Sequence, residues 1–181
     1  HSMSAWDEGD CHVILQSFRM PRFDLNFNLS SVNLHTFLHQ TNFNLCEKKI
    51  EDSLIIEEME GEWPSINEDY RGKKHQFGYF GLHENGKFIG VAKVDLKVKK
   101  LVKKLIWPNS NWRSGDFVFA PKKEKKEKKE KRGKKRGNKK GKKGEKERKG
   151  EDVGYLEGIV TDEVTLESFL VMEDAKTMSA K

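Results

Sequence analysis

Short β-prone runs separated by turn-forming residues are the feature that most constrains the fold of this chain. Residues 88–96 read Phe-Ile-Gly-Val-Ala-Lys-Val-Asp-Leu, and they follow Asn85-Gly86, a pair typical of a two-residue β-hairpin turn. Similar runs lie at 11–19, 23–27, 34–45, 54–56, 75–82, 98–106, 116–120, 155–160 and 168–173. Many short strands with turn residues between them indicate an all-β sandwich, barrel or propeller.

One segment admits a second interpretation. Residues 97–104 can be scored as a basic amphipathic helix, because lysines alternate with apolar residues there. The β-branched Val98 and Val102, and the strand-like runs on both sides, favour a strand.

The charge of the chain is concentrated in one segment. Residues 122–150 hold 18 Lys or Arg and five Asp or Glu, a net charge of +13, whereas the other residues sum to −7. The basic pI therefore describes this segment alone and does not indicate a nucleic-acid-binding fold. Because the segment has no aliphatic or aromatic residue, we expect a solvated, disordered insertion.

The two cysteines, Cys11 and Cys46, show neither the spacing of zinc ligands nor a disulfide framework. The sequence therefore predicts two reduced thiols in a reducing compartment.

No apolar run approaches the roughly 18 residues of a membrane span. Because the sequence begins inside a motif, we expect further residues before His1. We leave the cytoplasm, a plastid and peripheral attachment to a membrane open as locations.

Five segments carry distinctive residue patterns. Residues 1–10 read His-Ser-Met-Ser-Ala-Trp-Asp-Glu-Gly-Asp, and residues 62–67 read Glu-Trp-Pro-Ser-Ile-Asn shortly before a Gly-Lys pair. Residues 90–96 read Gly-Val-Ala-Lys-Val-Asp-Leu, and residues 114–121 read Ser-Gly-Asp-Phe-Val-Phe-Ala-Pro. Residues 151–181 open with Glu-Asp-Val-Gly-Tyr-Leu and close with Asp-Ala-Lys-Thr-Met-Ser-Ala-Lys.

Together, and in this order, these segments resemble the carotenoid cleavage oxygenases. That family includes the retinal pigment epithelial membrane proteins and the carotenoid, apocarotenoid and stilbene dioxygenases. The resemblance covers residues 1–121 and 151–181 and is loosest at about 30–60. The chain departs from the family pattern at Ser4 (Asn in the family), Asp7 (Glu), Asp116 (Glu), Val153 (Asp) and Thr161 (His).

The resemblance implies a seven-bladed β-propeller. A blade takes ~40–50 residues, so the residues outside 122–150 correspond to about three blades. We therefore expect an all-β arc of about three blades with a disordered basic insertion. Its parts are propeller blades at 1–121, a Lys/Glu/Gly-rich low-complexity insertion at 122–150, and a further partial blade at 151–181.

The resemblance also implies a metal site, because four imidazoles hold Fe(II) in this family. His1 matches one of these metal ligands, and the other three are expected outside this sequence. Glu62 and Asp116 match carboxylates that accept a hydrogen bond from a ligand imidazole, which holds the ring in one tautomer. Each competes with a simpler interpretation as an acidic surface turn, and Asp116 is one methylene shorter than the family's Glu. The remaining histidines match no ligand position, although His35 and His39 on one strand could form a metal pair.

The implied activity is oxidative cleavage of a carbon–carbon double bond by an Fe(II)-dependent dioxygenase. O2 and an apolar polyene, such as a carotenoid or apocarotenoid, are the implied partners. With one ligand of four, we expect the chain alone to be inactive. Two alternatives stay open. One is a truncated or degenerate relative without activity. The other is a β-rich module whose basic segment binds nucleic acid or an anionic membrane, although it has no aromatic residue to stack on bases.

Overall fold

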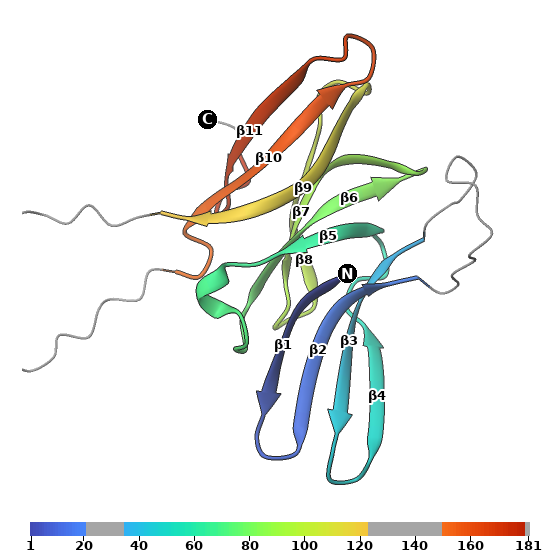
Figure 1. Cartoon of the computed structure of the whole chain (residues 1–181), viewed down its shortest axis with the longest axis vertical. Coiled ribbons are helices and arrows are strands. Elements are labelled where there is room, and N and C mark those ends of the chain that lie inside the picture. Colours follow the sequence, from blue (N-terminus) through green and yellow to red (C-terminus); the bar gives the residue numbers. More distant parts are fainter. Residues whose placement is uncertain (21–34, 123–149, 180–181) are drawn as a thin grey trace, which may run out of the picture.

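The computed structural model describes residues 1–20, 35–122 and 150–179, which form three antiparallel sheets (Figure 1). The predicted strand at 23–27 and residues 123–149 of the predicted insertion lie outside these ranges. The described residues contain one 3-10 turn, η1 (Glu68–Tyr70), and no α-helix. None of their helical elements is long and apolar enough to cross a membrane.

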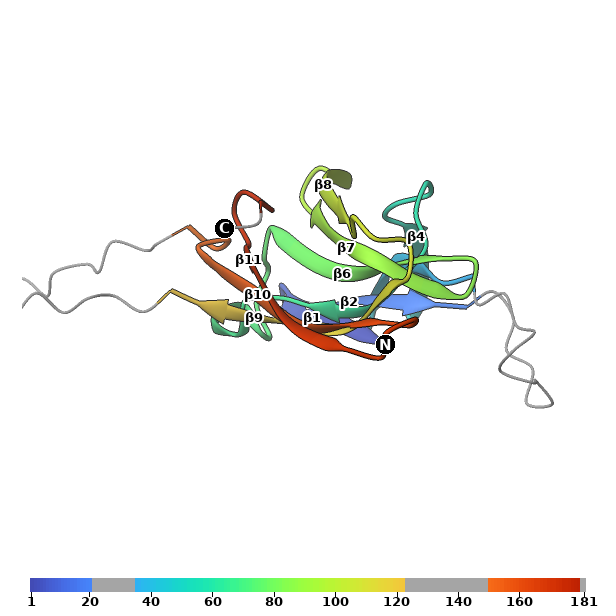
Figure 2. The ribbon, with the colours of Figure 1, turned by 90° about the horizontal axis from the view of Figure 1, so that it is seen from above.

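Each sheet is built from strands that follow one another in the sequence. The first sheet contains β1 (Ser2–Glu8), β2 (His12–Arg19), β3 (Phe37–Asn44) and β4 (Lys49–Leu54). The second contains β5 (Gly61–Ser65), β6 (Phe77–Glu84), β7 (Lys87–Asp95) and β8 (Lys100–Ile106). The third contains β9 (Trp112–Pro121), β10 (Gly154–Asp162) and β11 (Ser168–Asp174). Figure 1 shows them one above the other, and Figure 2 looks along that stack from the third sheet.

The second sheet is the centre of the fold because both faces of its middle strands, β6 and β7, are buried. Neighbouring residues of a strand point to opposite faces, so Phe80 and Ala92 pack towards the first sheet while Tyr79 and Val91 pack towards the third. The first interface contains Met3, Phe18, Leu38, Ile55, Ile56, Ile66, Leu82, Val94 and Leu96. The second contains Trp107, Phe117, Phe119, Leu156, Val160, Ala175 and Met178. Burial of each large apolar side chain contributes about 1.5–3 kcal/mol.

Polar contacts fasten the start of β10 to the second sheet. The Glu151 carboxylate accepts hydrogen bonds from the backbone N–H groups of Gln76 and Phe77, at 2.8 and 2.6 Å. The Tyr79 hydroxyl donates to the Ala175 carbonyl at 3.2 Å. Burial, and the carboxylate of Asp152 nearby, raise the pKa of Tyr79 far above its usual value, so the phenol stays protonated and remains a donor.

The predicted all-β class and the arc of about three blades are confirmed. Residues 97–104 form a turn and β8 rather than a helix, as their β-branched residues indicate. Asn85 and Gly86 have φ values of 50° and 77°, which is the left-handed pair that a type I′ hairpin turn needs.

Three strands carry no clear signal in the sequence. The first ten residues stand out for their motif, yet Ser2–Glu8 forms β1. Strand β4 is charged and exposed, and β5 contains Gly61 and Pro64, which have low β propensity. These strands are positioned by pairing and packing with the rest of the sheet, which the local sequence does not encode.

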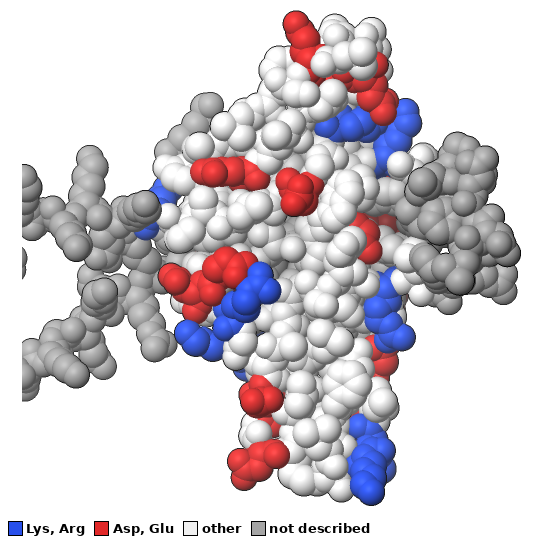
Figure 3. Space-filling model, in the orientation of Figure 1, with Lys and Arg blue, Asp and Glu red and all other residues white. Residues whose placement is uncertain are grey.

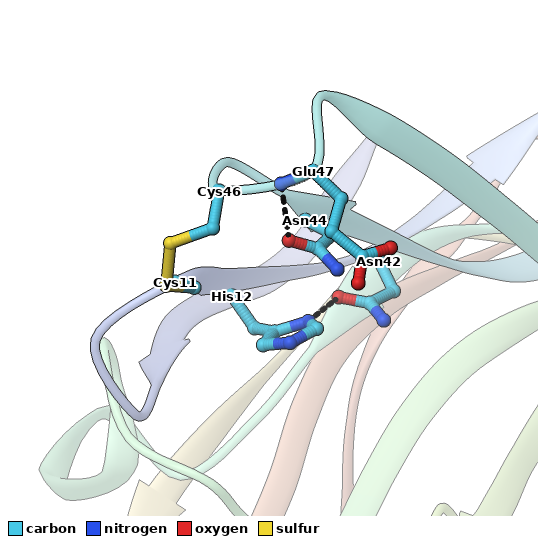
Figure 4. Close-up of a disulfide and its surroundings, with 6 residues drawn as sticks. All are labelled: Cys11, His12, Asn42, Asn44, Cys46 and Glu47. Carbon is cyan, nitrogen blue, oxygen red and sulfur yellow. Dashed lines mark hydrogen bonds between the residues drawn. A yellow bond between two sulfur atoms is a disulfide. The ribbon is translucent and has the colours of Figure 1, made fainter.

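The prediction of two reduced thiols is wrong, because Cys11 and Cys46 form a disulfide (Figure 4). The two cysteines lie in the turns that precede β2 and follow β3. These strands pair with His12 opposite Asn44, which brings the turns together with a Cα–Cα distance of 5.4 Å. The Leu45 N–H also donates to the Cys11 carbonyl at 2.7 Å. Strand pairing therefore sets a cysteine distance that the sequence separation of 35 residues conceals.

Candidate functional site

A cavity lies where the edge strands of the three sheets face one another. It has a volume of about 650 Å³ and is lined by residues from the start of β1, from β5 to η1, and from β9. We call it the site cavity. All three site residues expected from the sequence have a place near it: His1 and Asp116 line it, and Glu62 contacts His1 beside it.

His1 immediately precedes β1. Its carbonyl accepts a hydrogen bond from the Phe18 N–H on β2 at 2.8 Å, which fixes its backbone against the first sheet. Its side chain is 65% exposed, so the ring reaches away from the packed core.

The imidazole of His1 meets the carboxylate of Glu62, with Nδ1 2.6 Å from Oε2. A carboxylate can only accept a hydrogen bond, so this contact favours the ring form that carries its proton on Nδ1. In that form Nε2 holds a free lone pair, the state in which an imidazole binds a metal ion.

Glu62 is itself held in place from the backbone. Its Oε2 also accepts a hydrogen bond from the Trp63 N–H at 3.1 Å, and its side chain is only 17% exposed. Sequence reasoning gave Trp63 no role, and its position next to Glu62 was the signal available. Ser65 was missed as well; its hydroxyl accepts a hydrogen bond from the Phe119 N–H at 3.1 Å and so joins β5 to β9.

Asp116 lines the same cavity from β9 but does not contact His1. Its carboxylate is exposed and, among the described residues, forms no hydrogen bond. At the rim, Arg71 donates two hydrogen bonds of 2.5 Å to Glu68 and thereby lowers the pKa of that carboxyl below its usual value. Asp116 is therefore the acidic side chain of the cavity that has no partner within the described part of the chain.

The donor set fits one part of a metal site. Within residues 1–20, 35–122 and 150–179, no group of three or more His, Cys, Asp or Glu side chains is arranged to hold a metal ion. The chain supplies one imidazole with its carboxylate partner, and further ligands would have to come from elsewhere.

The other histidines have different partners. His35 and His39, the pair considered on one strand, bind separate carboxylates, Glu60 at 2.6 Å and Asp52 at 2.7 Å. The structure therefore does not bring these two rings together around one ion. His83, one of the histidines that match no ligand position, is buried beside Glu60 with an Nδ1–Oε2 distance of 3.4 Å.

Comparison with known families gives one match over almost the whole chain. Residues 1–180 match the family described as retinal pigment epithelial membrane protein, RPE65. Among curated proteins, the chain is 30% identical over 193 residues to a carotenoid 9,10(9',10')-cleavage dioxygenase of Crocus sativus. It is 28% identical over 203 residues to carotenoid 9,10(9',10')-cleavage dioxygenase 1 of Arabidopsis thaliana. Each alignment covers 100% of this chain and 32% of the relative, so the chain spans about a third of their length.

Solved structures show the same fold. Cobalt-substituted apocarotenoid oxygenase (ACO) of Synechocystis superposes with a TM-score of 0.73 at 19% identity, covering 100% of this chain and 34% of that protein. A chimera of ACO and RPE65 gives a TM-score of 0.73 at 18% identity, with the same coverage. The three sheets described above therefore correspond to about one third of these enzymes.

Proposed function

The chain belongs to the retinal pigment epithelial membrane protein family, and from this premise we propose that it forms part of an Fe(II)-dependent carotenoid-cleaving dioxygenase. The substrate class would be a carotenoid, apocarotenoid or related polyene, with O2 as co-substrate. The observation that carries the proposal is the 2.6 Å contact between His1 Nδ1 and Glu62 Oε2 beside the site cavity.

The relatives support the reaction class. Both curated proteins described above are named as carotenoid cleavage dioxygenases, and a third relative, 28% identical over 184 residues, is a chloroplastic 9-cis-epoxycarotenoid dioxygenase of Arabidopsis thaliana. That last name also supports a plastid as one location for this chain. The Synechocystis enzyme is described as cobalt-substituted, which supports a metal requirement for this fold.

In the proposed site, His1 would bind the iron through Nε2. Glu62 would accept a hydrogen bond from Nδ1–H, hold the ring in one tautomer, and add negative charge close to the ion. Bound iron would supply the activation of O2. The chain would also supply part of the wall for an apolar substrate, because Met3, Trp63 and Phe117 line the cavity. Asp116 would add a second carboxylate, oriented towards an imidazole from outside this chain.

We also propose that residues 122–150 are an insertion between propeller residues 1–121 and 151–181. Its support is the pairing of Pro121 with Gly154, the last and first residues of two neighbouring antiparallel strands. The segment therefore stands in place of a hairpin turn. The face in Figure 3 presents basic and acidic side chains in separate small groups, and none of them forms a broad basic surface.

The test is made in the intact protein that contains these residues. His1→Ala removes the proposed ligand, so iron content and cleavage of β-carotene should be lost together. The matched control is His12→Ala, because His12 lies on β2 and, among the described residues, its ring forms a hydrogen bond only with Asn42, at 2.9 Å. Iron content is measured by mass spectrometry and products by chromatography. If His1→Ala keeps the iron content of the wild type, the proposed ligand is wrong.

A further inference from the structure

Trp63 has a backbone conformation that few residues other than glycine adopt. Its φ is 54°, in the left-handed region, although it has a bulky side chain. It lies within β5, where the pairing with β6 shifts between Glu62 and Ser65. Such an irregularity redirects the backbone at one point of a strand.

Glu62 and Ser65 are both paired with β6, so the left-handed φ of Trp63 fixes how the Glu62–Trp63 peptide is oriented relative to the strand that follows. The N–H of that peptide donates to Glu62 Oε2 at 3.1 Å. The same oxygen is 2.6 Å from His1 Nδ1. One carboxylate oxygen therefore accepts two hydrogen bonds, one from the backbone that positions it and one from the imidazole.

The indole ring is the part of Trp63 that stabilises this conformation. It stacks on Phe88 of β7, with ring centroids 3.8 Å apart and planes inclined by 21°. Gly81 on β6 makes room for the stack, since a Cβ there would lie 3.0 Å from the Phe88 ring. A strained backbone persists only when its surroundings fix it, and here Phe88 provides that support.

We propose that Trp63 is a positioning residue for His1. Its left-handed backbone, stabilised by the stack on Phe88, holds the Glu62 carboxylate on the Nδ1 side of the imidazole and so sets the tautomer that leaves Nε2 free. The consequence for a metal rests on the function proposed above, whereas the effect on the tautomer is a property of the metal-free chain.

A competing role for Trp63 is that of a wall of the site cavity, because Trp63 is one of its lining residues. The two roles differ in what glycine does at this position. Glycine adopts a positive φ without strain but has no ring. A wall residue would therefore lose its function as Gly or as Ala alike, whereas the positioning role needs only the φ angle and is restored by Gly.

The experiment compares Trp63→Phe, Trp63→Ala and Trp63→Gly in the full 181-residue chain labelled with ¹⁵N-histidine. The ¹⁵N shifts of the neutral His1 ring report its tautomer, and a His1→Gln spectrum identifies its signals. We expect the Nδ1–H form in the wild type, in Trp63→Phe and in Trp63→Gly. In Trp63→Ala the ring should revert to the tautomer mixture of free histidine. In the intact protein, Trp63→Ala should also weaken iron binding by about ten-fold.

An unchanged tautomer in Trp63→Ala overturns the proposal, and so does a Trp63→Gly variant that behaves like Trp63→Ala. If Trp63→Ala does not fold, Phe88→Ala takes its place, because it removes the stack and keeps Trp63. In Phe88→Ala the tautomer of His1 must then shift towards the mixture of free histidine. If the His1 tautomer changes in the Trp63 variants as expected but the intact protein binds no iron, the proposed function fails and the positioning role stands.

Discussion

The ammonium group of Lys93 lies 2.8 Å from the carboxylate of Asp152, joining the second sheet to the residues that lead into the third. The Lys93 side chain is 2% exposed, and its charge also lies 4.3 Å from the centre of the Phe77 ring. The interface between these sheets therefore contains a nearly buried ion pair. Without Asp152, the Lys93 ammonium would keep the Lys176 carbonyl, 3.3 Å away, but would lose its carboxylate.

Removing the acidic partner should destabilise the protein strongly. Asp152→Ala leaves the buried Lys93 ammonium without its carboxylate, so we expect a loss of about 3 kcal/mol in the free energy of unfolding. Lys93→Met should cost less, because it fills the same space with an apolar chain. Urea denaturation measures the free energy of unfolding of both variants. Lys97→Met serves as the control, because Lys97 is exposed. Equal losses in Asp152→Ala and Lys97→Met would show that the pair contributes no stability.

The three proposed site residues should rank in their effect on iron. In the intact protein, Glu62→Gln keeps an acceptor but removes the charge, and we expect iron affinity to fall by about 10–100-fold. Asp116→Asn should have a smaller effect, because Asp116 has no contact with His1. Iron titration under one buffer condition gives the order. The isolated chain should bind Fe(II) more weakly than micromolar, and tighter binding would contradict the need for ligands from outside it.

Stability should fall as the pH drops below about 6.5, the usual pKa of histidine. Burial lowers the pKa of His75, so its ring stays neutral in the folded state while it becomes protonated in the unfolded chain. The contribution of His75 to the free energy of unfolding is therefore complete above about pH 6.5 and is lost as the pH falls. His75→Leu should reduce this slope, as measured by urea denaturation between about pH 5 and 8. If His75→Leu keeps the slope of stability against pH that the wild type shows, other groups cause the pH dependence.

The pKa of Asp174 is lowered mainly by its hydrogen bond from Lys122, so its stabilising effect is lost only in stronger acid, below the usual carboxyl pKa of about 4. The two effects therefore occupy separate pH ranges and can be measured in one series.

The disulfide should stabilise the first sheet. It closes a loop between residues separated by 35 positions, and loops of this order give about 3–4 kcal/mol in the chain-entropy treatment. Reduction with dithiothreitol should lower the Tm of the wild type, while the Cys11→Ser/Cys46→Ser double variant should start lower and not respond. A wild type whose Tm is the same before and after reduction would refute this contribution.

Deleting residues 123–149 should leave the fold intact. The Lys122 N–H donates to the Val153 carbonyl at 3.3 Å, so the strands on both sides are already paired where the segment begins and ends. Joining Lys122 to Gly150 should keep the β-sheet circular dichroism and the Tm of the parent. A large loss of either would mean that the segment takes part in folding.

The sequence was most informative where structure is local. The Asn85-Gly86 turn specifies the hairpin of β6 and β7, and the β-prone runs at 75–82 and 88–96 predict its two strands. Strand β5 was not recognised, because Gly61 and Pro64 argue against a strand and its position comes from its contacts with β6 and β9. At Gly61, a Cβ would lie 2.3 Å from the Phe80 ring, so this glycine is needed for tertiary packing rather than for a turn.

The candidate site residues were chosen through resemblance and not through spacing. His1 and Glu62 are 61 residues apart, and no periodicity brings them together. The left-handed φ of Trp63 and the pairing of Cys11 with Cys46 both arise from how strands meet in space, and neither leaves a mark in the local sequence.

The middle strands of the second sheet are covered on both faces, which has a consequence for how the molecule loses its structure. Either outer sheet can open while the other stays packed, whereas opening of the second sheet must release both. The site cavity draws on edge strands from all three sheets, so it exists only while both interfaces are closed. The frequency at which the site cavity opens is therefore the sum of the frequencies at which the two interfaces open. A ligand bound in the cavity would make the three sheets unfold as a single cooperative unit.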